Sequence, residues 1–233
     1  MKIEDYSLYL VITEEYGKGR DALEIAESAV KGGVDIIQMR EKNKPGAELI
    51  ELGKRLSAFC REKKVIFIVN DDPLLAKEVD ADGVHLGQED LARHPLKETR
   101  EAIGRDKIIG ISTHSIEQFE QANGADVDYI SFGPIFNTKA KDYSIGIGNI
   151  NKVLDITKKP VFFIGGINLQ NVSNILKEGA KNIALIRGVT EAEDIGRAVK
   201  YFKKILKKQR GMKCSWTKLR SQKLYWRRTT RNS

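Results

Sequence analysis

The feature that most constrains this sequence is the regular alternation of short apolar runs with amphipathic stretches over its first 208 residues. Continuous runs of β-branched and other apolar residues are typical of strands buried on both faces of a parallel sheet. Eight strands are predicted, each followed by a helix; they cover residues 8–12, 34–39, 65–69, 82–86, 108–111, 129–132, 161–164 and 183–186. Eight such units without a linker predict an α/β fold, a (β/α)8 TIM barrel with a single domain over residues 1–208. An open doubly wound sheet is the alternative.

The positive charge of the chain is concentrated at its C-terminal end. The formal net charge is +8, but residues 207–233 contain ten of the 40 Lys and Arg residues and none of the 32 acids. The remainder, with 30 basic and 32 acidic residues, is close to neutral, which argues against nucleic-acid binding by the barrel. We expect residues 209–233 to form a basic, disordered tail. Trp216 and Trp226 leave RNA or an anionic surface as an alternative partner for that tail.

Two further patterns bear on the compartment. No apolar run reaches the length of a membrane span, and the acidic start of the chain lacks the features of a secretory signal. Cys60 and Cys214 are too few for a disulfide framework. These patterns predict a protein of the reducing cytoplasm without a membrane partner.

Acidic residues follow two neighbouring predicted strands. The run 65–69 ends at Asn70-Asp71-Asp72-Pro73, and the next strand is followed by Asp90. Because parallel strands end at the same face of a barrel, Asp71 and Asp90 are expected to converge there. Two carboxylates suit Mg²⁺, which prefers a few carboxylates together with substrate phosphate. Alternatively, the acids before Pro73 only start a helix, as a cap followed by proline; one acid can cap while its neighbour binds metal.

Cationic and glycine-rich segments follow other predicted strands. Arg40 and Lys42 come after the second strand, and the long loop 133–148 carries Lys141. These three residues predict an anion site near the acids, with a solvated charged loop as the alternative. Gly166 and the loop after the eighth strand predict a second anion site, because barrels often bind phosphate there. Two anion sites and a metal site on one face indicate an enzyme that joins two phosphorylated substrates.

Several short motifs together carry a family resemblance. They are Gln38-Met39-Arg40-Glu41-Lys42, Asn70-Asp71, the segment 81–90, Gly110-Ile111-Ser112, Gly133-Pro134-Ile135-Phe136 and Ile164-Gly165-Gly166-Ile167. With these motifs, nearly all of residues 1–206 resembles the thiamine-phosphate synthase family. The resemblance implies a TIM barrel and a Mg²⁺-dependent transferase. Its reaction would couple hydroxymethylpyrimidine diphosphate to a thiazole phosphate, or to its carboxylated form with loss of CO₂, through a dissociative step that leaves a pyrimidine cation.

The resemblance also implies the residues of the site. Asp71 and Asp90 would hold Mg²⁺. The pyrimidine diphosphate would be bound by Gln38, Met39, Arg40, Glu41, Lys42, Asn70, Ser112 and Lys141. The thiazole phosphate would be bound by Thr138, Lys139, Ala140, Gly166, Ile186 and Arg187. Arg40, Lys42, Lys141 and Ser112 are the predicted catalytic residues, because the leaving diphosphate requires stabilisation of charge rather than a protein base.

Three positions depart from the usual family pattern. Ala140 replaces a threonine of the thiazole site, Arg187 replaces a serine, and Asn182 replaces a glycine. These departures are expected to affect the thiazole side of the site. They leave two alternatives to the synthase: a thiazole tautomerase-like barrel that uses His114 as its acid and base, and a non-catalytic barrel that binds a phosphorylated metabolite.

Overall fold

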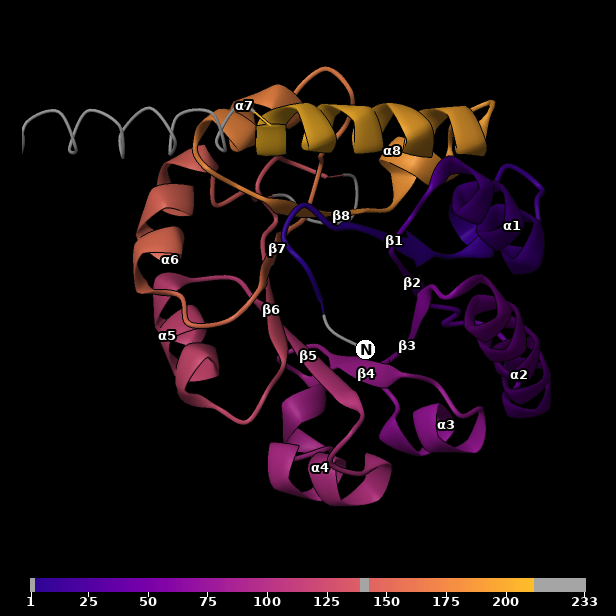
Figure 1. Ribbon diagram of the computed structural model, residues 1–233. Helices are drawn as coiled ribbons and strands as arrows, with labels where there is room; N and C mark the ends of the chain where they lie inside the picture. The colour runs from indigo at the N-terminus through magenta and orange to yellow at the C-terminus, as the bar shows by residue number, and fades with distance from the viewer. Residues whose placement is uncertain (1–2, 139–142, 212–233) are drawn as a thin grey trace, which may run out of the picture.

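The computed structural model describes residues 3–138 and 143–211, and these residues form the predicted closed barrel (Figure 1). Eight parallel strands follow one another around the barrel in sequence order. They are β1 (Leu8–Ile12), β2 (Ile36–Met39), β3 (Ile66–Asn70), β4 (Gly83–Leu86), β5 (Ile108–Thr113), β6 (Tyr129–Phe132), β7 (Val161–Phe163) and β8 (Asn182–Leu185). The prediction of a TIM barrel is therefore confirmed, and the open sheet is excluded.

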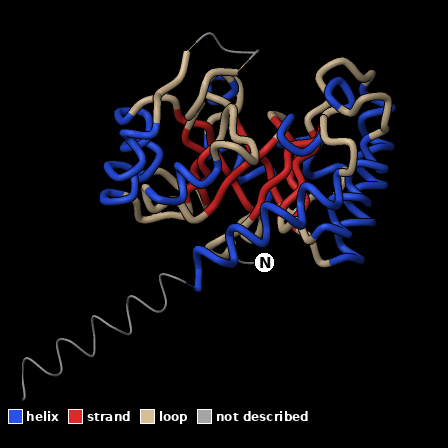
Figure 2. The backbone as a smooth tube through the Cα atoms, turned by 90° about the horizontal axis from the view of Figure 1, so that it is seen from above, coloured by secondary structure: helices blue, strands red, loops and turns tan. Residues whose placement is uncertain are grey.

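Helices surround the strands on the outside of the barrel (Figure 2). They are α1 (Ala22–Gly32), α2 (Gly46–Lys63), α3 (Pro73–Glu78), α4 (Leu96–Ile103), α5 (Ile116–Gly124), α6 (Ile150–Ile156), α7 (Val172–Lys177) and α8 (Arg187–Thr190), with single 3₁₀ turns η1 (Glu14–Tyr16), η2 (Asp90–Ala92) and η3 (Ile147–Asn149). A final helix covers residues 195–211. No helix in the described part of the chain is long and apolar enough to cross a membrane.

The end of the chain differs from the prediction in its boundary. The expected last helix, 191–208, is instead a single turn at α8 followed by the helix 195–211. The Gln209 amide nitrogen donates to the Leu176 carbonyl at 3.0 Å, so this helix is still attached to the barrel beyond residue 208. The predicted tail therefore begins inside a helix, and its residues 212–233, with both tryptophans, lie outside the described residues.

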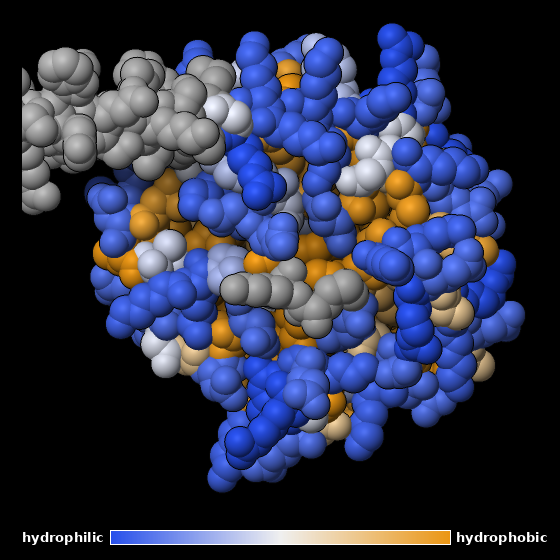
Figure 3. All heavy atoms as spheres, viewed as in Figure 1, coloured by the Kyte–Doolittle hydropathy of each residue, from blue (hydrophilic) through white to orange (hydrophobic). Residues whose placement is uncertain are grey.

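The strands separate two apolar cores, as the alternation of side chains along a strand requires. The larger core lies between the strands and the helices and includes Leu10, Met39 and Phe67. The smaller core fills the barrel and contains Tyr9, Val11, Ile36, Ile66, Ile68, Ile108, Tyr129, Phe162 and Ala184. Ile3 packs against the interior core, and the segment that leads from Ile3 to β1 crosses the centre of the barrel in Figure 1. Hydrophilic side chains surround the apolar centre of this face (Figure 3).

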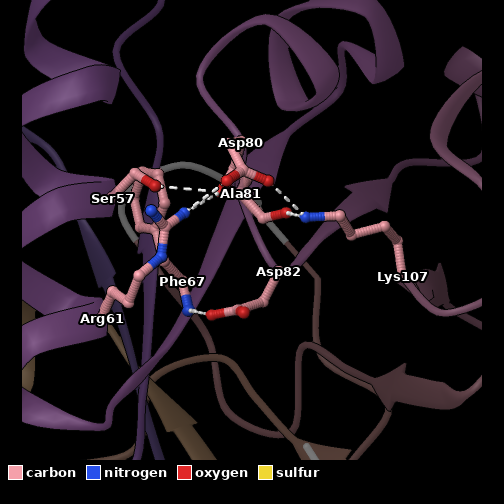
Figure 4. A network of polar contacts seen from close by, with 7 residues as sticks. All are labelled: Ser57, Arg61, Phe67, Asp80, Ala81, Asp82 and Lys107. Atoms are coloured by element: carbon pink, nitrogen blue, oxygen red, sulfur yellow. Dashed lines mark hydrogen bonds and ion pairs between the residues drawn. The ribbon is translucent and has the colours of Figure 1, made fainter.

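Aspartates at the amino ends of alternate strands form hydrogen bonds that hold neighbouring strands together. Asp35, Asp82 and Asp128 precede β2, β4 and β6, and their carboxylates accept hydrogen bonds from the backbone N–H groups of Leu8, Phe67 and Ile109 at 2.7–2.8 Å. Each bond ties an even-numbered strand to the odd-numbered strand before it. Figure 4 shows the β3–β4 example beside a surface network in which Asp80 pairs with Arg61 and Lys107.

Asn182 belongs to this structural end of the barrel. Its side-chain oxygen accepts a hydrogen bond from the Ser7 backbone N–H at 3.0 Å, and the residue is buried at the amino end of β8. Asn182 therefore lies at the amino end of β8, whereas Ile186, a predicted residue of the thiazole site, follows the carboxyl end of that strand. The expectation that Asn182 affects the thiazole side is wrong, because the side chain instead joins β8 to the start of β1.

A missing side chain on β5 makes room for the large aromatic ring of Tyr129. A Cβ atom added to Gly110 would lie 2.0 Å from the Tyr129 ring, which is fully buried. The ring packs edge-on against Phe162, with 5.4 Å between ring centroids. Both the position of the ring and the closure of β5 on β6 therefore depend on glycine at residue 110.

We predict that Gly110→Ala lowers the free energy of unfolding by about 1–3 kcal/mol or more, because the added methyl group overlaps a ring that has no room to move. Urea denaturation measures this change. Gly46→Ala is the matched control: nothing lies within 4 Å of the added atom at this first residue of α2, so its stability should change by less than about 1 kcal/mol. Equal stabilities for the two variants would contradict the packing argument.

Candidate active site

The predicted site residues that follow β2 to β5 come together at the carboxyl end of the barrel. Gln38 points into the barrel, where its amide nitrogen donates to the Tyr9 hydroxyl at 2.8 Å. Asn70 ends β3 and Ser112 lies near the end of β5. Arg40 continues the sheet beyond β2, since its backbone N–H donates to Ile12 at 2.9 Å. The alternation of side chains predicted after β2 is confirmed for Gln38 and Met39.

Met39 and Glu41 point to the other side of the same segment. Met39 is buried in the core between the strands and the helices. The Glu41 carboxylate accepts a hydrogen bond from the Glu14 backbone N–H at 2.7 Å, and Lys44 pairs with Glu14 at 2.8 Å. Burial, with the charge of Glu14 adding to it, raises the pKa of Glu41. Glu41 therefore supports the neighbouring η1 turn, while Met39 packs in the core, and a contact of either residue with substrate stays a prediction.

Asp71 and Asp90 form a close carboxyl pair, as the sequence predicted. Their carboxyl groups lie close enough to shift each other's pKa, although they follow different strands. Asp71 has a left-handed backbone conformation (φ 66°), which non-glycine residues rarely adopt, and its N–H donates to the His85 carbonyl at 2.8 Å. Backbone strain of this kind costs on the order of 1–3 kcal/mol and clusters at functional sites. Here it turns the Asp71 side chain towards Asp90.

The two carboxyls of the pair have different proton affinities. Burial, the hydrogen bond to Asp90 and the charge of Asp90 raise the pKa of Asp71 to about 6, although Lys42 and Arg40 act in the opposite sense. Burial also raises the pKa of Asp90. Its hydrogen-bond partners Asp71, the Gly87 backbone and Arg93 lower that pKa by more, so the net shift is downwards. Two carboxylates that repel each other at neutral pH, with oxygen donors only, suit a hard divalent cation.

Asp72 resolves the alternative interpretation of this segment. Its carboxylate accepts hydrogen bonds from the backbone N–H groups of Leu74 and Leu75 at 2.9 and 3.0 Å, and Pro73 is the first residue of α3. Asp72 is therefore the helix cap. Asp71 is free of that role, so the cap and the carboxyl pair exist side by side.

A cavity of about 430 Å³ lies on the side of β7 and β8. Its lining brings together the predicted residues Thr138, Gly166, Ile186 and Arg187 with the unpredicted Tyr16 and Glu191. Arg187 is the one cationic side chain among the described residues that line it. Its guanidinium lies 3.8 Å from the centre of the Tyr16 ring, and its Nε lies 3.5 Å from the Glu191 carboxylate. The predicted residues Lys139, Ala140 and Lys141 lie outside the described residues.

Other polar residues near the mouth were not predicted as ligands. Tyr9, His85 and Tyr129 are buried inside the barrel and form hydrogen bonds with one another and with Gln38 and Ser112. The signal that could have found them is the alternation along each strand, which puts them on the inward side. His114 lies just after β5, and its Nδ1 is 2.5 Å from the Gly133 carbonyl oxygen. Its predicted alternative role as an acid and base stays a prediction.

The fold and the site define a TIM barrel with acidic and basic side chains gathered at the carboxyl ends of its strands, the arrangement of an enzyme that handles anions. The family model described as thiamine monophosphate synthase matches residues 8–189 of the chain. The chain therefore belongs to the thiamine monophosphate synthase family, and the resemblance noted in its motifs is confirmed.

Individual relatives agree with this assignment over most of their length. A thiamine-phosphate synthase of Halalkalibacterium halodurans is 41% identical over 213 residues, which cover 90% of this chain and 99% of the relative. One of Persephonella marina is 38% identical and covers 88% of this chain and 98% of the relative. The solved structure of thiamine phosphate pyrophosphorylase from Pyrococcus furiosus has a TM-score of 0.80 at 36% identity, and the match covers 88% of this chain and 96% of that structure.

The raised pKa of Asp71 predicts a stability cost in the absence of divalent ions. Its carboxyl group titrates at about 6 in the folded protein and near 3.8 in an unfolded chain. As the pH rises through this window the unfolded chain loses its proton first, so the folded state loses stability. Asp71→Asn removes the charge while its amide can still donate to Asp90. We expect a thermal midpoint at pH 7 that is higher by about 2–4 °C, for a gain on the order of 1 kcal/mol, and no gain near pH 4.

Differential scanning fluorimetry in EDTA at the two pH values measures this effect. Asp72→Asn is the matched control, because asparagine caps a helix as well as aspartate does and the carboxyl pair is untouched. A variant at residue 71 that is equally stable or less stable than the wild type at pH 7 would contradict the assigned repulsion.

Proposed function

We propose that the chain is an active thiamine-phosphate synthase, which couples hydroxymethylpyrimidine diphosphate to a thiazole phosphate and releases diphosphate. The family assignment supports the reaction. The observation that carries the proposal for this chain is the position of the Asp71–Asp90 pair within the electrostatic influence of Arg40 and Lys42. Carboxylates and cations that act on one another at a barrel mouth suit a diphosphate with its counter-ion.

We assign the metal of the reaction to Asp71 and Asp90, and we take it to be Mg²⁺. Among the described residues, no group of three or more His, Cys, Asp and Glu side chains could hold a metal. Mg²⁺ fits a pair of carboxylates, because it retains waters and takes further ligands from substrate phosphate. When bound, it would supply positive charge that offsets the charge of the leaving diphosphate.

The side chains of the chain itself bind and orient the pyrimidine diphosphate. Arg40 and Lys42, with Lys141 of the long loop, neutralise the diphosphate as its bond to the pyrimidine methylene carbon breaks. The electron pair of that bond leaves with the diphosphate oxygen, and the methylene carbon becomes a cation. Gln38, Asn70 and Ser112 supply polar contacts to the same substrate. The thiazole nitrogen then donates its lone pair to the methylene carbon, so no protein base is needed.

The second substrate is assigned to the 430 Å³ cavity beside β7 and β8. A cavity of this size is typical of small-ligand sites. Thr138, Gly166 and Ile186 line it, and Arg187 supplies the positive charge for the thiazole phosphate. Lys139 and Ala140 belong to the same predicted site, in which Ala140 lacks the hydroxyl of the usual threonine. Both substrates are small phosphorylated molecules.

We place the protein in the reducing cytoplasm. The thiol of Cys60 is buried and free, which suits that compartment.

The metal assignment predicts the behaviour of two single variants. Asp71→Asn and Asp90→Asn should each reduce turnover by at least about tenfold, because one charged ligand of the cation is lost. Each should also require a higher Mg²⁺ concentration for half-maximal activity. The assay is the purified protein with both substrates and a Mg²⁺ titration, with thiamine phosphate detected as fluorescent thiochrome. Full activity of either variant at limiting Mg²⁺ would refute the assignment, and Asp72→Asn serves again as the neighbouring control.

Arg187 offers a test of the thiazole side. A hydrogen bond to a charged group contributes roughly 1.5–3 kcal/mol, while a lost hydroxyl bond costs about 0.5–1.5 kcal/mol, so Arg187 can outweigh the missing hydroxyl at residue 140. Arg187→Ser should therefore raise the KM for the thiazole phosphate about tenfold or more and leave the KM for the diphosphate nearly unchanged. Ala140→Thr should help most in the Arg187→Ser background.

The opposite result would give another role to the Arg187 guanidinium, which stacks on the Tyr16 ring. If Arg187→Ser lowers the thiazole KM and raises turnover, the guanidinium obstructs the cavity instead of binding phosphate. Such a result would favour the tautomerase-like or ligand-binding alternative over the synthase. Steady-state kinetics with each substrate varied in turn separates the two outcomes.

A further inference from the structure

The barrel interior contains a chain of hydrogen bonds that the mechanism above does not use. The Gln38 amide nitrogen donates to the Tyr9 hydroxyl at 2.8 Å, and the Tyr9 and Tyr129 hydroxyl oxygens lie 2.9 Å apart. The Tyr129 hydroxyl lies 2.9 Å from Nδ1 of His85, and Nε2 of His85 lies 2.9 Å from the Ser112 hydroxyl. The five side chains come from five different strands, so the chain crosses the barrel beneath its mouth.

Three of the four bonds in this chain, those that join Gln38, Tyr9, Tyr129 and His85, are buried and therefore matter for stability. Tyr129 is completely buried, and Tyr9, Gln38 and His85 are less than a tenth exposed. A buried polar group without a partner costs more than the bond itself contributes. An imidazole nitrogen that accepts a hydrogen bond carries no proton, so a ring that accepts at Nδ1 has its proton on Nε2. A neutral imidazole has one nitrogen that donates and one that accepts.

These facts fix the direction of the chain. The Gln38 amide nitrogen can only donate, so the Tyr9 oxygen accepts and its proton points to Tyr129. Tyr129 then donates to Nδ1 of His85, which leaves the imidazole proton on Nε2 and directed at Ser112. In the reverse direction the Tyr9 oxygen would accept two bonds, and its own buried proton would have no partner among these side chains. The Ser112 hydroxyl therefore accepts from His85 and keeps its own proton for another acceptor.

We propose that Tyr129, with Tyr9 and His85, is a positioning residue that holds Gln38 and Ser112 in register and presents the Ser112 hydroxyl as a hydrogen-bond donor to the bound diphosphate substrate. The identity of that substrate rests on the proposed function. The direction of the chain does not, because it follows from the side chains alone. Among the described residues, the Ser131 hydroxyl lies 3.3 Å from that of Ser112 and can accept its proton.

Tyr129→Phe tests the positioning role, because it keeps the ring in place and removes only the hydroxyl. We expect the KM for hydroxymethylpyrimidine diphosphate to rise and kcat to fall, each about three- to tenfold, with the KM for the thiazole phosphate unchanged. Phe162→Leu is the matched control, since that ring lies 5.2 Å from Tyr9 and 5.4 Å from Tyr129 but takes no part in the chain. Phe162→Leu should lower the free energy of unfolding without raising the KM for the diphosphate relative to the KM for the thiazole phosphate. A Tyr129→Phe variant that loses stability but keeps both KM values would overturn the proposal.

The direction of the chain has its own test, which does not depend on turnover. Nitrogen-15 NMR of the labelled full-length protein should find a neutral His85 ring with its proton on Nε2. In Gln38→Glu the ionised carboxylate accepts the Tyr9 proton, so the chain reverses and the His85 proton should move to Nδ1. A wild-type ring with the proton on Nδ1, or no change of tautomer in Gln38→Glu, would overturn the proposal. If the wild type lacks synthase activity, the proposed function fails while the tautomer experiment still decides the direction.

Discussion

Closure of a parallel barrel is the constraint on which the rest of this structure depends. Because every strand runs in the same direction, eight carboxyl ends meet on one rim and eight amino ends on the other. The two rims are used differently in this chain. Asp35, Asp82, Asp128 and Asn182 hold strand ends together at the amino rim. The carboxyl rim gathers Arg40, Asp71, Asp90 and Ser112, the residues to which the proposed function assigns the binding of the metal and the diphosphate.

Sequence patterns were sufficient for the fold because its signals are local. Apolar runs gave all eight strands, and the acids before Pro73 gave the start of α3. The convergence of Asp71 and Asp90 followed from topology alone, since neither residue is near the other in sequence. The end of the last helix was misplaced because Gln209 is held by a contact with Leu176, a residue of another helix that no local pattern reveals.

The site was predicted less completely, for two physical reasons. A short motif does not show which of its side chains face the ligand. Met39 and Glu41 both belong to the motif 38–42, but Met39 lies in the core between the strands and the helices, and Glu41 accepts a hydrogen bond from η1. Aromatic residues with a hydroxyl group also look like ordinary core in a sequence. Tyr16 lies under Arg187 and Tyr129 lies in the centre of the interior chain, and only the folded arrangement gives these rings polar partners.

The aspartate bonds at the amino rim divide the barrel into strand pairs, β1 with β2, β3 with β4, and β5 with β6. The pairing of β7 with β8 has no such bond among the described contacts, and its register joins two residue pairs where the other junctions join three or four. Local opening is easiest where backbone contacts are fewest. This junction borders the 430 Å³ cavity. The closed sheet therefore has its fewest paired residues at a junction that forms part of the cavity wall, so opening of the sheet there would change the shape of the cavity that the proposed function assigns to the second substrate.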